Sequence, residues 1–164
     1  MTIRAADTTD GAAIWDLLAP VFRAGDTYMV NPKISREDAL AYWLSPDKTV
    51  FLAAEGGAEL GTYYIRPNQQ GGGAHVCNCG YVTARAARGR GIARAMLDHS
   101  LKIAKDMGFR AMQYNFVVAT NTRAIDIWDR AGFDVVGRLP GAFQHPDEGF
   151  VDALVMWKNL VEEG

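Results

Sequence analysis

The segment Arg88-Gly89-Arg90-Gly91 alternates two basic side chains with two glycines, and residues with the apolar spacing of a helix follow it directly. The first N–H groups of a helix are unpaired and carry partial positive charge, so a phosphate binds there favourably. Glycines allow a ligand to approach these amides closely, and the arginines add charge at the rim. The sequence therefore predicts a site for a phosphate-bearing ligand at this turn.

The turn lacks the features of two other phosphate-binding motifs. No Lys-Ser or Lys-Thr pair follows the glycines, which excludes a P-loop, and a dinucleotide-binding motif would have a third glycine where Arg94 stands. A tight strand-to-helix turn with two incidental arginines is the alternative without a ligand. The turn alone does not separate this alternative from a phosphate site.

The elements that position the turn follow from apolar spacing and turn residues. A strand over residues 74–83 precedes it, a helix over 92–107 closed by Gly108 follows it, and a strand over 112–118 and a helix over 121–131 come next. The other predicted elements are strands at 3–5, 133–136 and 151–157, a helix over 12–18 capped by Asp7 or Thr8, a helix capped by Ser35, and a hairpin of 50–54 with 60–65. Residues 23–34 are expected to form a loop. This order predicts a mixed α/β fold.

The composition is that of an ordinary globular protein. Of 164 residues, 49% are hydrophobic and 22% charged, and a chain of this length fits a single domain over residues 1–164. The net charge of −2 supplies no broad field for nucleic acid or anionic lipid. No apolar run reaches the roughly 20 residues that cross a bilayer, and the first residues do not resemble a secretory leader. We therefore expect a cytoplasmic protein with no nucleic-acid or membrane partner.

Cys77 and Cys79 are separated by one residue in a predicted strand, which places both side chains on one face. This geometry does not favour a disulfide, and Cys-x-Cys without a second pair is a weak zinc signal. We expect two reduced thiols and no metal site.

Several motifs together point to one family. Arg88-Gly89-Arg90-Gly91-Ile92-Ala93 fits the pattern Arg/Gln-x-x-Gly-x-Gly/Ala, and Asn121-x-x-Ala124-Ile125-x-Ile127-Trp128, Ala131-Gly132-Phe133 and residues 151–156 fit later stretches. With these motifs the chain resembles the GNAT superfamily of acyl-CoA-dependent N-acyltransferases over nearly its whole length. The resemblance implies a mixed, mostly antiparallel central sheet with a splayed strand pair and helices on both faces. It also implies acetyl-CoA as the acetyl donor.

The resemblance assigns cofactor-binding residues. It implies that the strand before the turn pairs with pantetheine and polarises the thioester carbonyl, that the turn holds the pyrophosphate, and that Asn121 contacts the cofactor arm, although Asn121 is equally suited to capping its helix. Trp128 stands where many members carry a tyrosine that protonates the leaving thiolate; an indole only donates, so Trp128 is expected to pack against the cofactor. Solvent or Tyr114 could then supply the proton. The cofactor-binding residues implied are Tyr81, Val82, Thr83, Arg88, Gly89, Arg90, Gly91, Ile92, Ala93, Asn121 and Trp128.

A finer resemblance concerns the acceptor. The run from Asn115 through Phe116 and Val118 into Thr120-Asn121 resembles the subgroup that acetylates L-azetidine-2-carboxylate and related proline analogues. It implies that Asn115 positions the acceptor, since an amide can both donate and accept. A satisfied buried amide is the structural alternative. Residues 139–146 would form a loop at the acceptor mouth.

Other polar residues are weaker candidates. His75 has a pKa range suited to a general base, but a lone histidine in a strand is more often structural or exposed. Asp26, Tyr28 and Asn31 in the early loop could line the acceptor site, with solvated loop residues as the alternative. Asp152, in an apolar strand, is expected to be a paired structural acid.

Three functions follow from the sequence. The first is acetylation of the amine of a small molecule, such as an amino acid or proline analogue, by direct attack in a ternary complex. The second is acetylation of a protein or peptide, and the third is acyl-CoA sensing without catalysis, which the absent tyrosine at position 128 allows. A late strand at a sheet edge often pairs with a second copy, so a homodimer is expected.

Overall fold

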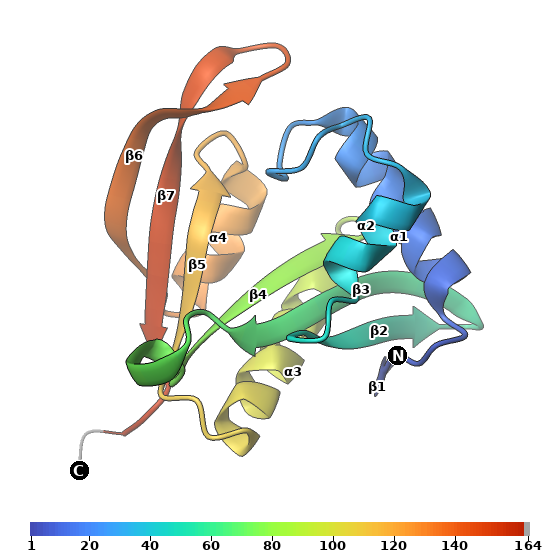
Figure 1. The fold of residues 1–164 in the computed structure, drawn as a ribbon, viewed down its shortest axis with the longest axis horizontal. Helices are drawn as coiled ribbons and strands as arrows, with labels where there is room; N and C mark the ends of the chain where they lie inside the picture. Colours follow the sequence, from blue (N-terminus) through green and yellow to red (C-terminus); the bar gives the residue numbers. More distant parts are fainter. Residues whose placement is uncertain (163–164) are drawn as a thin grey trace.

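All strands join one twisted sheet with helices on both faces (Figure 1). The computed structural model describes residues 1–162. The strands are β1 (Thr2–Ala5), β2 (Thr49–Glu55), β3 (Ala58–Pro67), β4 (Val76–Thr83), β5 (Ala111–Val118), β6 (Asp134–His145) and β7 (Gly149–Asn159), in the order β1-β2-β3-β4-β5-β7-β6. Among the strands of this described part, only β4 and β5 pair in parallel, and every other pairing is antiparallel. The mixed, mostly antiparallel α/β fold predicted from the sequence is confirmed.

The helices divide between the two faces of the sheet. Helices α1 (Gly11–Ala24) and α2 (Arg36–Trp43) bury Leu18 and Trp43 against Leu52 and Tyr64. Helices α3 (Ile92–Asp106) and α4 (Thr122–Arg130) pack on the opposite face, where Met96 contributes to a second core cluster. Because the period of a strand is two, alternate residues of β3 and β4 feed these two clusters. Within residues 1–162, no helix has the length and apolar character needed to cross a membrane.

Strands β4 and β5 separate soon after they meet. Backbone pairing is confined to Val76 with Ala111 and Cys77 with Met112, and beyond this point the strands diverge (Figure 1). The next β4 residue, Asn78, replaces the backbone pairing with a side-chain bond, because its Nδ2 donates to the Gln113 carbonyl oxygen at 2.9 Å. The splayed strand pair expected from the family resemblance is therefore present.

Two irregularities shape the strands around this gap. A three-residue step on β5, from Tyr114 to Val117, opposes a two-residue step on β7, so β5 contains a β-bulge that includes Asn115. In β6 the four-residue step from Leu139 to Phe143 also opposes two residues of β7. This second irregularity bends the β6–β7 hairpin, which rises at the end of β5 opposite the α1–α2 loop (Figure 1).

Several boundaries predicted from the sequence were wrong. Residues 139–145 continue β6 and do not form a loop, because their backbone still pairs with β7 across the bend. Helix α1 continues to Ala24 rather than ending near Leu18, since Val21 and Phe22 extend its buried face. Strand β4 begins at Val76, which leaves His75 outside it.

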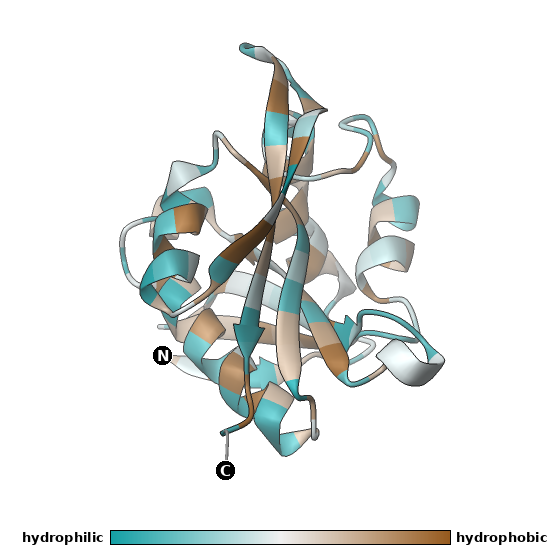
Figure 2. Ribbon diagram, turned by 90° about the vertical axis from the view of Figure 1, so that its left-hand side faces the viewer, coloured by the Kyte–Doolittle hydropathy of each residue, from teal (hydrophilic) through white to brown (hydrophobic). Residues whose placement is uncertain are grey.

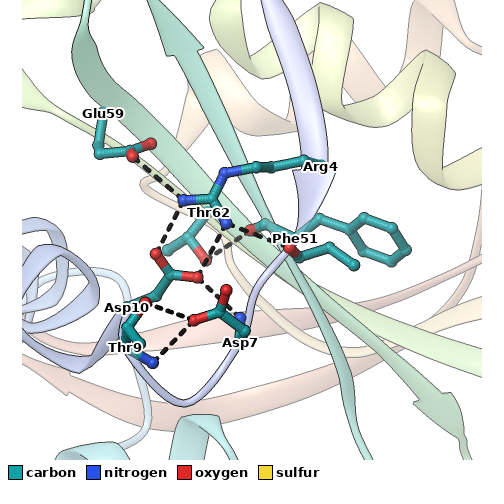
Figure 3. Close-up of polar contacts among 8 residues, drawn as sticks. Arg4, Asp7, Thr9, Asp10, Phe51, Glu59 and Thr62 are labelled. Carbon is teal, nitrogen blue, oxygen red and sulfur yellow. Dashed lines mark hydrogen bonds and ion pairs between the residues drawn. The ribbon is translucent and has the colours of Figure 1, made fainter.

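The start of α1 also differs from the prediction, because Asp10, rather than Asp7 or Thr8, occupies the N-cap position. Its carboxylate does not bond to the first N–H groups of the helix. Instead Arg4 donates to its two oxygens at 2.8 and 2.9 Å, and the Asp7 N–H donates at 2.7 Å (Figure 3). The Asp10 side chain therefore ties β1 to α1. The predicted cap at Ser35 is confirmed, since its Oγ accepts from the Asp38 N–H at 3.0 Å.

Both cysteines are buried and free, and they join the same core cluster, as their spacing predicted.

Candidate functional site

A cavity of about 680 Å³ lies at the splay between β4 and β5. It is lined from both faces of the sheet: the start of α3 and one face of α4 form what we call its α3 side, and the α1–α2 loop and Tyr64 form its α1 side. This arrangement is possible because the separated strands leave an opening through the sheet. A volume of this size is in the range of small-molecule sites, about 300–1,000 Å³.

The glycine turn forms the α3 side of the cavity. Gly89 and Gly91 have φ angles of 80° and 81°, a left-handed conformation that strongly favours glycine, and Gly91 is the N-cap of α3. No acidic side chain lies in the first turn of α3, so the positive end of the helix is not neutralised locally. Arg88 lines the cavity beside these amides. The turn therefore has the geometry of an anion site.

The two arginines of the turn, Arg88 and Arg90, point to different places. Arg90 points elsewhere: its guanidinium pairs with Glu55 at 2.5 Å, and it does not line the cavity. Arg94 and Arg123, which the sequence analysis did not select, line the cavity at the first turns of α3 and α4. The positive charge on the α3 side thus comes from Arg88 together with two residues of the helices.

Three aromatic side chains form the wall behind the splay. The Trp128 ring lies 5.0 Å from the Tyr81 ring and 4.9 Å from the Tyr114 ring, between centroids. The Tyr81 hydroxyl hydrogen-bonds to the Ser100 hydroxyl at 2.7 Å and the Tyr114 hydroxyl at 3.0 Å. Loss of hydration raises the pKa of both tyrosines well above the ordinary value. A raised pKa makes both hydroxyls weaker acids than an ordinary tyrosine, and therefore poor proton donors to a thiolate.

The α1–α2 loop is attached directly to β4. The Tyr28 hydroxyl donates to the Tyr81 carbonyl oxygen at 2.9 Å, and burial raises the pKa of Tyr28. Asp26 and Tyr28 line the cavity, whereas Asn31 turns back to accept from the Lys33 N–H at 2.9 Å and does not line it. Two of the three loop residues considered from the sequence are thus brought to the cavity.

Gly80 makes room for a ring on the α1 side. A Cβ at Gly80 would lie 2.4 Å from Tyr64 Cε2, so only glycine allows the Tyr64 ring to lie across β4. The ring also packs edge-on against Trp43, with 4.8 Å between centroids. Tyr64 lines the cavity, and its position therefore depends on a glycine in the neighbouring strand.

The floor of the α1 side is polar. Arg66 from β3, Asn78 from β4 and Asn115 from β5 all line the cavity, and we call these three residues the polar strip. Arg66 Nε donates to Asn78 Oδ1 at 3.2 Å. Asn115 accepts from Gln113 Nε2 at 3.0 Å and donates to Asn68 Oδ1 at 2.6 Å. Since an amide has two N–H groups and two lone pairs on oxygen, Asn115 keeps one of each for a ligand.

The bent β6–β7 hairpin brings His145 to the same cavity. Its Nδ1 accepts from the backbone N–H groups of Asp147 and Glu148 at 3.1 and 3.2 Å. The neutral ring therefore carries its hydrogen on Nε2 and can only donate from that atom. His145 is suited to hydrogen-bond a ligand oxygen and not to remove a proton.

The sequence-predicted site residues converge on the cavity with three exceptions, which are Arg90, His75 and Asn31. All the implied cofactor-binding residues except Arg90 line it, and so does Asn115. His75 lies in an exposed turn before β4 and is not among the lining residues, so the geometry gives it no contact with a ligand there. Asn121 lines the cavity and also caps α4, with its Oδ1 accepting from the Ala124 N–H at 3.4 Å.

Asp152 is paired, as expected: Arg138 and the Gly141 N–H donate to it at 2.6 and 2.9 Å, and this pairing lowers its pKa. It stabilises the bend of the hairpin.

Arg66 and His145 of the α1 side were not singled out from the sequence, although His145 belongs to residues 139–146, which were expected at the acceptor mouth. Arg66 follows Tyr64 by two positions, so strand alternation could have placed both on one face. His145 reaches the cavity through the bend at residues 139–143, for which the sequence carries no clear signal beyond Pro140-Gly141.

Known proteins share this sequence pattern and architecture. A structure described as a GCN5-related N-acetyltransferase from Kribbella flavida is 38% identical with a TM-score of 0.91, covering 96% of each chain. N-acetyltransferase aca1 of Schizosaccharomyces pombe is 28% identical over 148 residues, covering 80% of this chain and 71% of that protein. The structure of yncA, a putative acetyltransferase from Salmonella typhimurium with acetyl-CoA, has a TM-score of 0.86 at 21% identity, covering 100% of this chain and 96% of the other.

The family described as Acetyltransferase (GNAT) matches residues 12–133, which span the helices of the α1 side, the splayed strands and the glycine turn. The match therefore includes both sides of the cavity except for the hairpin that carries His145. The chain belongs to the acetyltransferase (GNAT) family and is an acyltransferase whose donor is acetyl-CoA.

Proposed function

We propose that this single-domain enzyme transfers the acetyl group of acetyl-CoA to the amine of a small molecule, with an amino acid or proline analogue as the acceptor. Donor and acceptor occupy the α3 and α1 sides of the same cavity, and the amine attacks directly in a ternary complex. The observation that carries this proposal is the cavity through the splayed sheet, which has an anion site on one side and the polar strip on the other.

The α3 side fits the donor. Acetyl-CoA supplies an acetyl thioester, which is activated for transfer to an amine. Gly89, Gly91 and Arg88 would hold the pyrophosphate at the amides of α3, because charge-assisted bonds to a helix N-terminus favour a dianionic group. Tyr81, Val82 and Thr83 border the splay, where they have no backbone partner on β5. The Tyr81 carbonyl oxygen already accepts from Tyr28, so the remaining backbone groups on this edge of β4 are left for the pantetheine arm.

Trp128 and Asn121 complete the donor site from α4. Trp128 packs beside Tyr81 and Tyr114 and presents an apolar surface, while Asn121 begins the helix at the cavity. Because the pKa values of Tyr81 and Tyr114 are raised, neither hydroxyl is a strong acid. A thiol pKa of about 8.5 lets the thiolate leave with little assistance, so solvent suffices as the proton source.

The α1 side supports a small acceptor. The α1–α2 loop and the hairpin residue His145 border the same cavity from different directions, which restricts an extended peptide. Asn115, placed in the β5 bulge, has one donor and one acceptor available for the substrate. Both features favour a compact amine with further polar groups over a protein side chain.

The test is thiol release from acetyl-CoA against a panel of amino acids and proline analogues, aminoglycosides, polyamines and short peptides. We expect turnover with a small amino acid, and loss of that turnover in Asn115→Ala. Asn159→Ala is a matched control, because Asn159 lies at the end of β7 and, within residues 1–162, its side chain bonds only to the backbone of Val161. Turnover confined to peptides would favour protein acetylation, and tight acetyl-CoA binding without turnover on any acceptor would favour a sensor.

We also propose a homodimer formed through the outer edge of the sheet. Strand β6 is an edge strand, and large apolar side chains of β6 and β7 are exposed: Val135, Val136, Leu139 and Phe150. Figure 2, viewed from the β6–β7 side, shows brown apolar segments along these strands. Sedimentation of the wild type as a dimer and of Phe150→Glu as a monomer would support this assembly, and a monomeric wild type would contradict it. The cytoplasmic location stays a prediction from the sequence.

A further inference from the structure

The positive charges around the cavity lie in two separate places. Among the described residues, four arginines line it. Arg88, Arg94 and Arg123 lie at the N-terminal ends of α3 and α4, on the α3 side. Arg66 comes from β3 and belongs to the polar strip on the α1 side. The phosphates of the donor account for the first group of arginines but not for Arg66.

The Arg66 side chain is held in place by a buried amide. Its Nε donates to Asn78 Oδ1 at 3.2 Å, and Asn78, which is only 6% exposed, is itself fixed by its bond to the Gln113 carbonyl oxygen. Asn78 is the residue at which backbone pairing of β4 with β5 stops. The guanidinium is therefore positioned next to the point where the sheet opens.

The two terminal nitrogens of Arg66 have little protein to bind. Within residues 1–162 they make no hydrogen bond to a protein acceptor, and the nearest acid is Asp47, at 3.7 Å between Arg66 Nη1 and Asp47 Oδ2. Both partners of this pair are partly exposed, at 32% and 51%, and such pairs contribute little. A guanidinium whose Nε is engaged and whose terminal nitrogens have only this weak ion pair and no hydrogen bond can receive a carboxylate in two parallel bonds.

We propose that Arg66 binds the carboxylate of the acceptor, held by Asn78, and that the acceptors are therefore α-amino or α-imino acids and not simple amines. This inference rests on the proposed function and names its substrate class. Asp26 supports this assignment. In the described part of the chain it is the one carboxylate that lines the cavity, and it lies on the α1 side, where it would attract the ammonium group of an amino acid. Asn115 then contacts the acceptor alongside Arg66.

The experiment compares two acceptors that differ only in charge, L-azetidine-2-carboxylate and its carboxamide, in the wild type and in Arg66→Gln. For each acceptor the ratio of kcat/KM between variant and wild type is taken, so that the different amine pKa values of the two acceptors cancel. We expect Arg66→Gln to lower kcat/KM for the carboxylate by about tenfold to a hundredfold, as for a lost charge-assisted hydrogen bond. The carboxamide should lose much less, and the KM for acetyl-CoA should stay unchanged.

Two further variants separate binding from a structural role. Arg66→Lys keeps the charge without the paired N–H groups and should restore part of the preference for the carboxylate. Asp47→Asn removes the acidic side chain that pairs with Arg66 at 3.7 Å and should leave both acceptors unaffected. Thermal melts and acetyl-CoA binding show whether each variant is folded.

The failures of the two proposals can be distinguished. If the wild type acetylates the amino acid and Arg66→Gln lowers kcat/KM for both acceptors equally, Arg66 is not the carboxylate-binding residue, although the proposed function stands. If the wild type acetylates polyamines or peptides and no amino acid, both proposals are wrong.

Discussion

The two sides of the cavity present different kinds of groups to a ligand. On the α3 side the ligand-facing groups are largely backbone amides, placed by two glycines and the start of one helix within consecutive residues. On the α1 side they are side chains from three strands, a loop and a hairpin that lie far apart in the sequence. A backbone site specifies a phosphate whatever the rest of the ligand, whereas a side-chain site can change its substrate with one or two substitutions. This difference fits a common donor and a variable acceptor.

The largest effect that separates the two sides is expected at Gly91. Gly91→Ala forces a side chain into φ 81°, which should displace the first amides of α3, and the loss of one or two charge-assisted bonds should raise the KM for acetyl-CoA by about tenfold to a hundredfold. Gly57 is a matched control, with φ 80° in the β2–β3 turn and open space around its Cβ position.

Gly57→Ala should cost the same conformational energy, about 1–2 kcal/mol, without changing the kinetics. Equal changes in KM for acetyl-CoA in the two variants would show that the turn acts only through stability. Steady-state kinetics with thermal melts on both variants decide the matter.

A second variant is expected to damage the α1 side. In Gly80→Ala the new Cβ would meet the Tyr64 ring at 2.4 Å, and overpacking of this kind costs about 1–3 kcal/mol. Displacement of the ring should raise the KM for the acceptor more than that for acetyl-CoA. Tyr64→Leu removes the ring, so chemical denaturation should find the double variant less destabilised than the sum of the two single changes. Strict additivity would mean that the two residues do not interact.

A third variant should leave both sides intact while weakening the fold. Arg4 and the Asp7 N–H hold the pKa of Asp10 at about 2, below its ordinary value of 3.8, so the interaction stabilises the fold above about pH 4 and is lost as pH falls toward 2 (Figure 3). Asp10→Asn should therefore unfold more easily at pH 7, and its difference from the wild type should shrink between about pH 4 and pH 2.

Urea unfolding across this pH range measures the difference, with the exposed Asp106→Asn on α3 as a control. The KM values for donor and acceptor should be the same in Asp10→Asn and the wild type. A raised KM for either substrate would connect the β1–α1 junction to the cavity.

The smallest effect is expected at Tyr114. Because loss of hydration raises its pKa, removal of the hydroxyl in Tyr114→Phe should change kcat by no more than about threefold, compared with about a hundredfold or more when a general acid is lost. A hundredfold loss of kcat with unchanged acetyl-CoA binding would identify Tyr114 as the proton donor.

The contrast between the two sides also explains how far the sequence could be interpreted. The glycine turn, its helix and the neighbouring strands are local patterns, so their positions could be predicted from consecutive residues. The family resemblance supplied the cofactor-binding candidates outside the turn, which are Tyr81, Val82, Thr83, Asn121 and Trp128, and all of these line the cavity. Arg90, which the sequence offered as a cofactor-binding residue, does not line the cavity; its partner, Glu55, is distant in sequence and nothing local reveals the pair.

The α1 side depends on a strand bend and on a strand register that local sequence patterns do not reveal. The bend that brings His145 to the cavity comes from extra residues in β6 opposite β7. Pro140 and Gly141 lie in this bend, and their residue types are also typical of a loop, which is why the segment was predicted as one. Arg66 lies one residue beyond the strand predicted over 60–65, because β3 continues to Pro67, and its relation to Asn78 required the β3–β4 register. His75 was misplaced because β4 begins at Val76, two residues later than the predicted strand.

The most direct test of donor and acceptor sharing one cavity is the initial-velocity pattern. Acetyl-CoA is varied at several fixed concentrations of the amino acid that reacts fastest in the acceptor panel, and thiol release is followed. The account predicts intersecting double-reciprocal lines and no thiol release in the absence of acceptor, since both substrates are bound when transfer occurs. Parallel lines, with an acetyl group recovered on the buried Cys79 that lines the cavity, would contradict it.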